Sequence, residues 1–160
     1  ASEPNGEAVP YFYSVTGVPG GFCEAFETAC VVEGLNNGVS HTFSVVTYFS
    51  DGGVSDASEI TTPVTPSTVP SQPLSPEANV VGDEVLVTWE SPLENGGLPV
   101  SGYVVTALPG QATCTTQVLS CRFSKLPYGA AYRFTVFAFN SNGDGIASEA
   151  TKPEWRMPGR

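Results

Sequence analysis

The first 70 residues of this chain lack positive charge: they contain eight Asp or Glu residues and neither Lys nor Arg. Residues 71–160 carry eight acids and all six bases, so the whole chain has a formal net charge of −10. A surface of this sign repels phosphate backbones, and we therefore expect no nucleic-acid partner. The plain interpretation of the acidity is that it keeps the protein soluble.

Long apolar runs are also lacking. None approaches the roughly 18 residues that a membrane-spanning helix needs, so we expect no membrane span. No signal peptide is visible at the start, which is consistent with a mature chain or an internal fragment. Charged residues make up only 14% of the chain, while Gly and Pro number 17 and 14. This mixture is typical of short strands joined by turns.

The residues of common catalytic sites are scarce. His41 is the only histidine, and the sequence contains no G-x-S-x-G, H-E-x-x-H or phosphate-loop motif. Asp51 and Asp56 in one loop, and Asn142 and Asp144 in another, do not have the oxygen spacing of an EF-hand. We therefore expect no enzyme activity, no catalytic residue, no cofactor and no metal site.

What the chain does contain is an internal repeat of about ninety residues. Residues 13–20 read YSVTGVPG and residues 103–110 read YVVTALPG, while ASEITTP at 57–63 returns as ASEATKP at 147–153. Five further residues recur 91 positions later: Leu35, Gly38, Phe43, Val45 and Gly52. Repetition at this length predicts two copies of one small domain.

Two equally spaced cysteine pairs lie within the repeat. Cys23 and Cys30 enclose six residues, as do Cys114 and Cys121. Zinc ligands are typically two to four residues apart, so this spacing disfavours a metal site. Because the spacing recurs, we favour one local disulfide per copy over four free buried thiols, each bond being worth roughly 2.5 kcal/mol in the chain-entropy model. Disulfides indicate an oxidising compartment, so we expect an extracellular or cell-surface protein.

The second copy alternates apolar and polar residues in segments that predict strands. Strands are expected at 84–90, 102–108, 131–140 and near 147–152, with two shorter ones carrying Cys114 and Cys121. The expected core faces comprise Val85, Val87 and Trp89, then Tyr103, Val105 and Ala107, then Tyr132, Phe134, Val136 and Ala138. Seven short strands without an amphipathic helix predict an all-β fold, an antiparallel immunoglobulin-like β-sandwich.

The second copy resembles a fibronectin type III domain over its full length. The matching features are the prolines at 70–76, Trp89, Tyr103, the corner pattern Leu126-x-x-Gly129-x-x-Tyr132, the strand Phe134-x-Val136-x-Ala138 and an Asn-Gly loop. The order of NGG-P-SGY, a cysteine pair and F-V-A-N-GxG-S is similar especially to the bacterial surface variety. The Arg-Gly-Asp tripeptide of some members is absent, so the resemblance implies no integrin binding.

The first copy matches the second only from Asn5-Gly6, which aligns with Asn95-Gly96, and it has His41 where the second has Tyr132. Its strands A and B, equivalent to about residues 71–92, are therefore expected to be missing. The predicted domains are a partial copy at 1–63, a Pro/Thr/Ser-rich linker at 64–72, a complete copy at 73–153 and a basic tail at 154–160.

Missing strands would uncover the apolar faces of Tyr13, Val15, Phe43 and Val45, and burial of such side chains is worth about 1.5–3 kcal/mol each. Three explanations stay open. The chain is a fragment, or another chain supplies the strands by β-augmentation, or the first copy closes in a different way. A tail-to-head contact between copies of the chain would build a filament.

Six residues are candidates for protein contacts: Tyr48, Phe137, Phe139, Trp155, Arg156 and Arg160. Phe137 and Phe139 fall opposite the core set, where cross-strand packing is the plain interpretation and an exposed aromatic strip the alternative. We expect a non-catalytic structural or adhesion segment of a longer surface, matrix or filament-forming protein, whose partners are copies of itself or flanking repeats. The alternative is a spacer or accessory module of a secreted polysaccharide-degrading enzyme.

Overall fold

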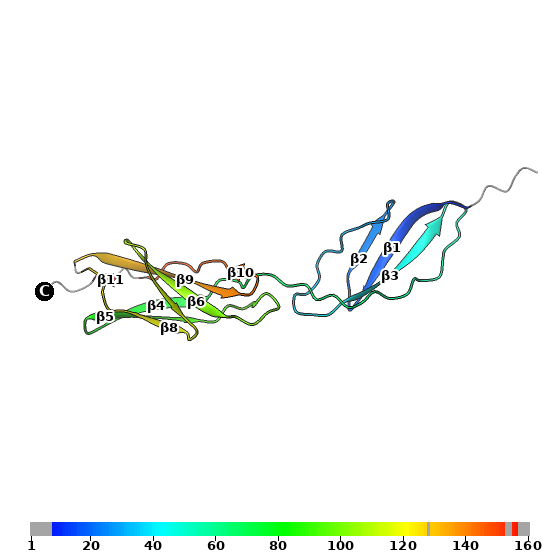
Figure 1. The fold of residues 1–160 in the computed structure, drawn as a ribbon. Coiled ribbons are helices and arrows are strands. Elements are labelled where there is room, and N and C mark those ends of the chain that lie inside the picture. The colour runs from blue at the N-terminus through cyan, green and yellow to red at the C-terminus, as the bar shows by residue number, and fades with distance from the viewer. Residues whose placement is uncertain (1–7, 128, 153–154, 157–160) are drawn as a thin grey trace, which may run out of the picture. The chain divides into compact units, whose positions relative to one another are not determined.

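The computed structural model describes residues 8–127, 129–152 and 155–156 (Figure 1). Every regular element in these ranges is a β-strand, and every strand pair is antiparallel. The chain divides into two compact units, residues 1–66 (unit 1) and 67–160 (unit 2). The described residues include no helix long and apolar enough to cross a membrane. The predicted all-β, antiparallel fold is confirmed.

Unit 1 contains one sheet of three strands, β1 (Pro10–Val18), β2 (Phe22–Ala25) and β3 (Thr42–Phe49), in the order β2-β1-β3. Figure 1 shows the three arrows side by side, with β1 in the middle. Val15 of β1 lies opposite Cys23 of β2 and Val45 of β3. The part of unit 1 that the structure describes has no second sheet.

Unit 2 contains two sheets that face each other (Figure 1). One sheet has the order β10-β9-β6-β7, formed by β6 (Gly102–Leu108), β7 (Ala112–Thr116), β9 (Ala131–Asn140) and β10 (Gly143–Asp144), and β11 (Trp155–Arg156) also pairs with β9. The other has the order β4-β5-β8, formed by β4 (Leu74–Val81), β5 (Glu84–Glu90) and β8 (Ser120–Phe123). The strands predicted at 84–90, 102–108 and 131–140 are confirmed.

The core of unit 2 lies between these sheets, on the faces that the alternating pattern predicts. All ten residues of the expected core set are buried. Trp89 of β5 contacts Tyr103 of β6, with ring centroids 5.4 Å apart. The Tyr132 hydroxyl donates a hydrogen bond of 3.3 Å to the Pro127 carbonyl, as a tyrosine corner requires. The two sheets therefore bury one continuous apolar layer.

The single sheet of unit 1 has the same strand order as the corresponding part of unit 2, where β7, β6 and β9 are neighbours. Counterparts of β4, β5 and β8 are not among the strands described in unit 1. Residues 29–32 correspond to β8 in the repeat, yet they do not form a strand. The reason is that β8 takes its backbone hydrogen bonds from β5, and a strand without such a partner leaves its backbone groups unpaired.

The segment after the last long strand of each unit, residues 55–61 in unit 1 and 148–151 in unit 2, is bound to that strand by both backbone and hydroxyl hydrogen bonds. In unit 2 the Ser148 and Thr151 amides donate to the carbonyls of Val136 and Phe134, while their hydroxyls accept from the amides of the same two residues. Successive contacts are three residues apart in this segment and two residues apart in β9. A period of three residues is that of a polyproline II helix. The prediction of a regular strand near 147–152 is therefore wrong. The β9 amides of Val136 and Phe134 donate to the hydroxyl oxygens of Ser148 and Thr151, where a regular strand would offer backbone carbonyls.

Unit 1 repeats this hydroxyl ladder with Ser55, Ser58 and Thr61. Their amides donate to the carbonyls of β3, and their hydroxyls accept from the amides of Thr47, Val45 and Phe43 respectively. The difference lies in burial. In unit 2 Ser148 and Thr151 are 6% and 1% exposed, whereas Ser58 and Thr61 are exposed to solvent.

Loss of a ladder hydroxyl should be more destabilising in unit 2 than in unit 1. Ser148→Ala or Thr151→Val leaves a buried β9 amide without its acceptor, which we expect to destabilise unit 2 by about 1–3 kcal/mol. Ser58→Ala or Thr61→Val exposes the matched β3 amide to water, and we expect a loss below about 1 kcal/mol. Urea titration followed by the amide NMR signals of each unit measures both values. Equal losses in the two units would contradict this account.

Candidate interaction face of unit 1

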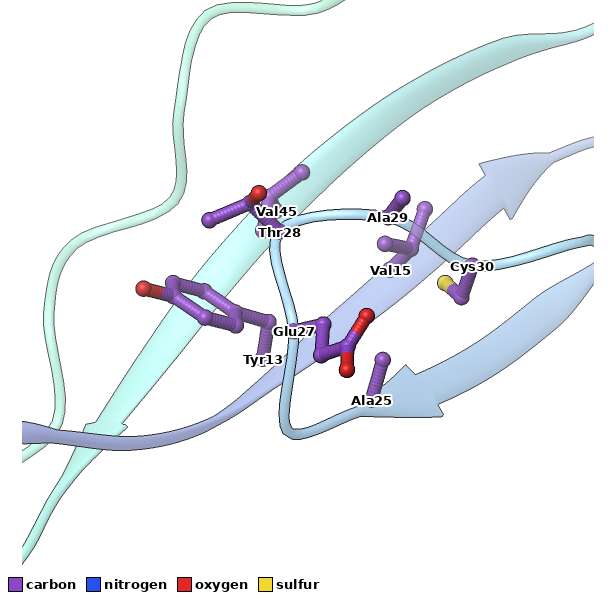
Figure 2. Close-up of a pocket in the computed structure, with 8 residues that line it drawn as sticks. All are labelled: Tyr13, Val15, Ala25, Glu27, Thr28, Ala29, Cys30 and Val45. Carbon is purple, nitrogen blue, oxygen red and sulfur yellow. The ribbon is translucent and has the colours of Figure 1, made fainter.

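One face of the unit 1 sheet carries the residues that correspond to the core of unit 2. Tyr13 and Val15 of β1 and Val45 of β3 lie on this face (Figure 2). All three side chains are half-buried. The counterparts of Val15 and Val45 in unit 2, Val105 and Val136, are 0% exposed. The same pattern of residues is therefore covered in one unit and open in the other.

A pocket of about 210 Å³ lies on this open face, as Figure 2 shows. Its lining consists of Tyr13, Val15, Ala25, Glu27, Thr28, Ala29, Cys30 and Val45. The sheet forms the apolar floor, and the loop at 27–30 forms one side. The disulfide between Cys23 and Cys30 ties that loop to β2, with the two Cα atoms 6.3 Å apart. The side of the pocket is thus held covalently to its floor.

The other end of the same face is closed by unit 1 itself. The Phe43 ring covers Gly17 so closely that an added Cβ would lie 2.7 Å from it. Val32 and Leu35 lie against Gly21, where a Cβ would meet them at 2.9 and 2.6 Å. These side chains form a small apolar cluster at one end. The open part of the face is therefore the stretch around Tyr13, Val15 and Val45.

The disulfide of unit 2 has a different role from that of unit 1. Cys114 of β7 is joined to Cys121 of β8, so the bond connects the two sheets. Cys121 is buried, whereas Cys30 is half-buried in its loop. Both expected pairings are present, and no cysteine is free.

His41 occupies the tyrosine-corner position of unit 1 and is 1% exposed. Its ring is stacked on that of Phe43, with centroids 6.4 Å apart. Neither ring nitrogen has a hydrogen-bond partner among the described residues, so no Ser, Cys or carboxylate is paired with it there. This environment supports a packing role. The described ranges also contain no group of three His, Cys, Asp or Glu residues that could hold a metal ion.

Tyr48 lies on the outer face of unit 1, opposite the pocket. It stacks on Phe12, with ring centroids 4.3 Å apart and an angle of 5° between the rings. Tyr11 and Phe26 pack edge-on against each other beside this pair and are 59% and 74% exposed. Our sequence interpretation did not include these three neighbours, although the alternation along residues 10–18 places Phe12 opposite Tyr13.

The other predicted contact residues are spread over unit 2. Phe137 and Phe139 are half-buried on the outer face of β9, and the Phe139 ring packs over Gly102. The backbones of Trp155 and Arg156 form β11, which pairs with β9. Arg160 lies outside the described residues. The side chains of Trp155 and Arg156 also lie outside the described residues, so the role of these residues in contacts stays a prediction.

Two facing antiparallel sheets, a tyrosine corner and an inter-sheet disulfide make unit 2 an immunoglobulin-like β-sandwich module. Residues 71–154, more than half of the chain, match the fibronectin type III domain family. The chain therefore belongs to this family.

Relatives of the chain are modular proteins of much greater length. It is 25% identical to fibronectin type-III domain-containing protein 3A of Mus musculus over 92% of this chain and 13% of that protein. It is 31% identical to the cardiac-type myosin-binding protein C of Rattus norvegicus over 53% of this chain and 7% of that protein. The solved structure of domains A168–A170 from titin has the same fold, with a TM-score of 0.57, 17% identity and coverage of 97% of this chain and 56% of that chain.

Matched core substitutions should reveal how open the unit 1 face is. Val105→Ala and Val136→Ala remove fully buried methyl groups, and we expect each to destabilise unit 2 by about 1.5–2.5 kcal/mol. Val15→Ala and Val45→Ala remove half-buried groups and should destabilise unit 1 by less than about 1 kcal/mol. Both Trp residues lie in residues 67–160, so their fluorescence reports on unit 2 and NMR signals report on unit 1. Losses of equal size at the paired positions would show that the face is already covered.

Proposed function

We propose that this chain is a non-catalytic structural segment of a longer secreted or cell-surface protein, and that β-strands from outside residues 1–160 complete unit 1. Family membership supports the non-catalytic role, because the fibronectin type III domain family is generally non-catalytic. The two disulfides support an oxidising compartment. The bacterial surface type, suggested by the order of the sequence motifs, stays part of this proposal.

The observation that carries the proposal is the open apolar face of the unit 1 sheet. In unit 2 the same face is covered by β4, β5 and β8, with Val85, Val87 and Trp89 of β5 directed into the core. A β-hairpin with apolar residues at alternate positions would cover Tyr13, Val15 and Val45 in the same way. Such strand addition is a known mode of association between polypeptides, in which backbone hydrogen bonds provide affinity and apolar side chains provide specificity.

The basic tail of a second copy is a weaker source of the covering strands. Its residues 155–156 already pair with β9 of their own unit, so their use on a second copy would compete with that pairing. The tail also has prolines at 153 and 158, and proline cannot donate a backbone hydrogen bond. We therefore favour a hairpin from a different module over self-assembly through the tail.

A hairpin graft tests the proposal directly. Residues 71–94 are copied in front of Asn5, which aligns with Asn95, so that the copy can occupy the position that β4 and β5 occupy in unit 2. We expect the urea midpoint of unit 1 to rise and the fluorescence of a hydrophobic dye to fall. The expected stabilisation is a few kcal/mol, because each newly buried valine contributes about 1.5–3 kcal/mol.

The matched control carries the same graft with the copies of Val85, Val87 and Trp89 replaced by Ser. This control should behave as the parent chain does, because a polar hairpin cannot cover the apolar face. If the apolar graft also leaves the midpoint and the dye fluorescence unchanged, the face does not accept strands and the proposal is wrong.

Light scattering on the intact chain and on a chain that ends at residue 152 identifies the source of the strands. We expect monomers in both samples, since β11 is engaged within its own unit. A larger mass for the intact chain alone would assign the covering strands to the tail of a second copy.

A further inference from the structure

The hydroxyl ladder of unit 1 determines which threonines near its end are free to react. Thr61 uses its hydroxyl to accept the Phe43 amide at 3.1 Å, and the next contact of the segment is the backbone pair of Val64 with His41. Contacts with the sheet therefore recur every third residue, as polyproline II geometry requires. Thr62 and Thr65 each follow a contacting residue and lie on the same side of the segment.

Thr62 and Thr65 differ from Thr61 in their hydrogen bonding. Both are exposed, and neither hydroxyl has a hydrogen-bond partner in the part of the chain that the structure describes. At about 3.1 Å of rise per residue, the two residues are about 9 Å apart along the segment. Each is followed directly by proline, Pro63 and Pro66, which keeps the backbone extended.

We propose that Thr62 and Thr65 are acceptor sites for O-linked sugars. Exposed Ser/Thr-rich segments with proline are typical of O-glycosylated stalks, since the extended backbone presents hydroxyls without a competing fold. The inference rests on the proposed secreted or cell-surface function, because such sugars are added in that pathway. The second repeat has Lys152 in place of Thr62, so this acceptor belongs to the first repeat alone.

The transfer uses a sugar activated as a nucleotide or lipid phosphate. The threonine Oγ1 attacks the anomeric carbon and forms the new C–O bond. The bond between that carbon and the phosphate oxygen breaks, and the phosphate leaves with the electron pair. The hydroxyl proton passes to a base of the transferase. No oxidant or reductant is needed.

Charge favours a sugar over a phosphate at these hydroxyls. With a period of three residues, Asp56 and Glu59 lie on the same side of the segment as Thr62. Unit 1 contains neither Lys nor Arg that could pair with an added anion. A phosphate would bring about −1.5 to −2 charges beside these carboxylates, which is unfavourable, whereas a neutral sugar adds no charge.

The test is secretion of the full chain from a host that O-glycosylates its own proteins, followed by intact mass measurement and site mapping by fragmentation. We expect mass increments of whole sugar residues, located at Thr62 and Thr65. The double variant Thr62→Ala/Thr65→Ala should return to the unmodified mass. The control Ser58→Ala/Thr61→Val should keep its sugars, because these hydroxyls are engaged with β3.

Three results would overturn the inference: a secreted, fully oxidised chain with bare threonines, sugars located only at other residues, or increments of phosphate mass. A chain that is secreted with four free thiols would instead count against the extracellular function itself. The hairpin graft can be measured on unglycosylated protein. Absence of sugars at Thr62 and Thr65 would therefore not affect the test of whether added strands complete unit 1.

Discussion

An apolar sheet face is stable in water only when a second layer covers it, and this constraint accounts for the differences between the two repeats. In unit 2, β4, β5 and β8 cover the sheet, and Phe134 and Val136 are completely buried. In unit 1 the described residues provide one sheet, and the corresponding Phe43 and Val45 are half-buried.

Other local differences follow from the same cause. The segment that corresponds to β8 does not form a strand in unit 1, because the described residues of unit 1 include no counterpart of β5 to pair with it. Its cysteine, Cys30, therefore fixes a loop to β2, whereas Cys121 connects two sheets. The ladder hydroxyls of Ser148 and Thr151 are buried, whereas those of Ser58 and Thr61 are exposed.

The sequence predicted the strands well where side chains alternate between a buried and an exposed face. Residues 84–90, 102–108 and 131–140 form strands with the bounds expected, because burial of one face is the main force that selects them. The last segment of the second repeat, near 147–152, was predicted less well. Its pairing depends on serine and threonine hydroxyls at every third position, a period that alternation rules do not detect.

Long-range polar contacts were beyond prediction for a similar reason. Asn140 is 5% exposed and donates to the carbonyls of Thr68 and Asn95 at 2.8 and 3.0 Å, while its side-chain oxygen accepts the Asn142 amide at 2.8 Å. It thereby joins three separate segments of unit 2. Turn composition identified the loops around it, but the two partners distant in sequence, Thr68 and Asn95, are visible only in the folded structure.

The apolar face of the unit 1 sheet was predictable from the repeat, since Tyr13, Val15 and Val45 align with core residues of unit 2. Its pocket was not, because the side at 27–30 depends on where the loop lies once Cys23 and Cys30 are joined. The aromatic cluster around Tyr48 was missed because only one strand of its face was considered. Together these features describe a sheet with an aromatic cluster on its outer face and a half-buried apolar pocket on its inner face.

The most direct test of this account is amide hydrogen exchange at Val45 and Val136 in the intact chain. The two amides are a matched pair: each lies in the corresponding strand and donates to a serine hydroxyl at 3.0 Å. They differ in whether a second sheet covers them. We predict that Val136 exchanges at least about a hundredfold more slowly than Val45, because opening unit 2 exposes a complete core. Equal protection of the two amides would contradict the claim that the face of unit 1 is open.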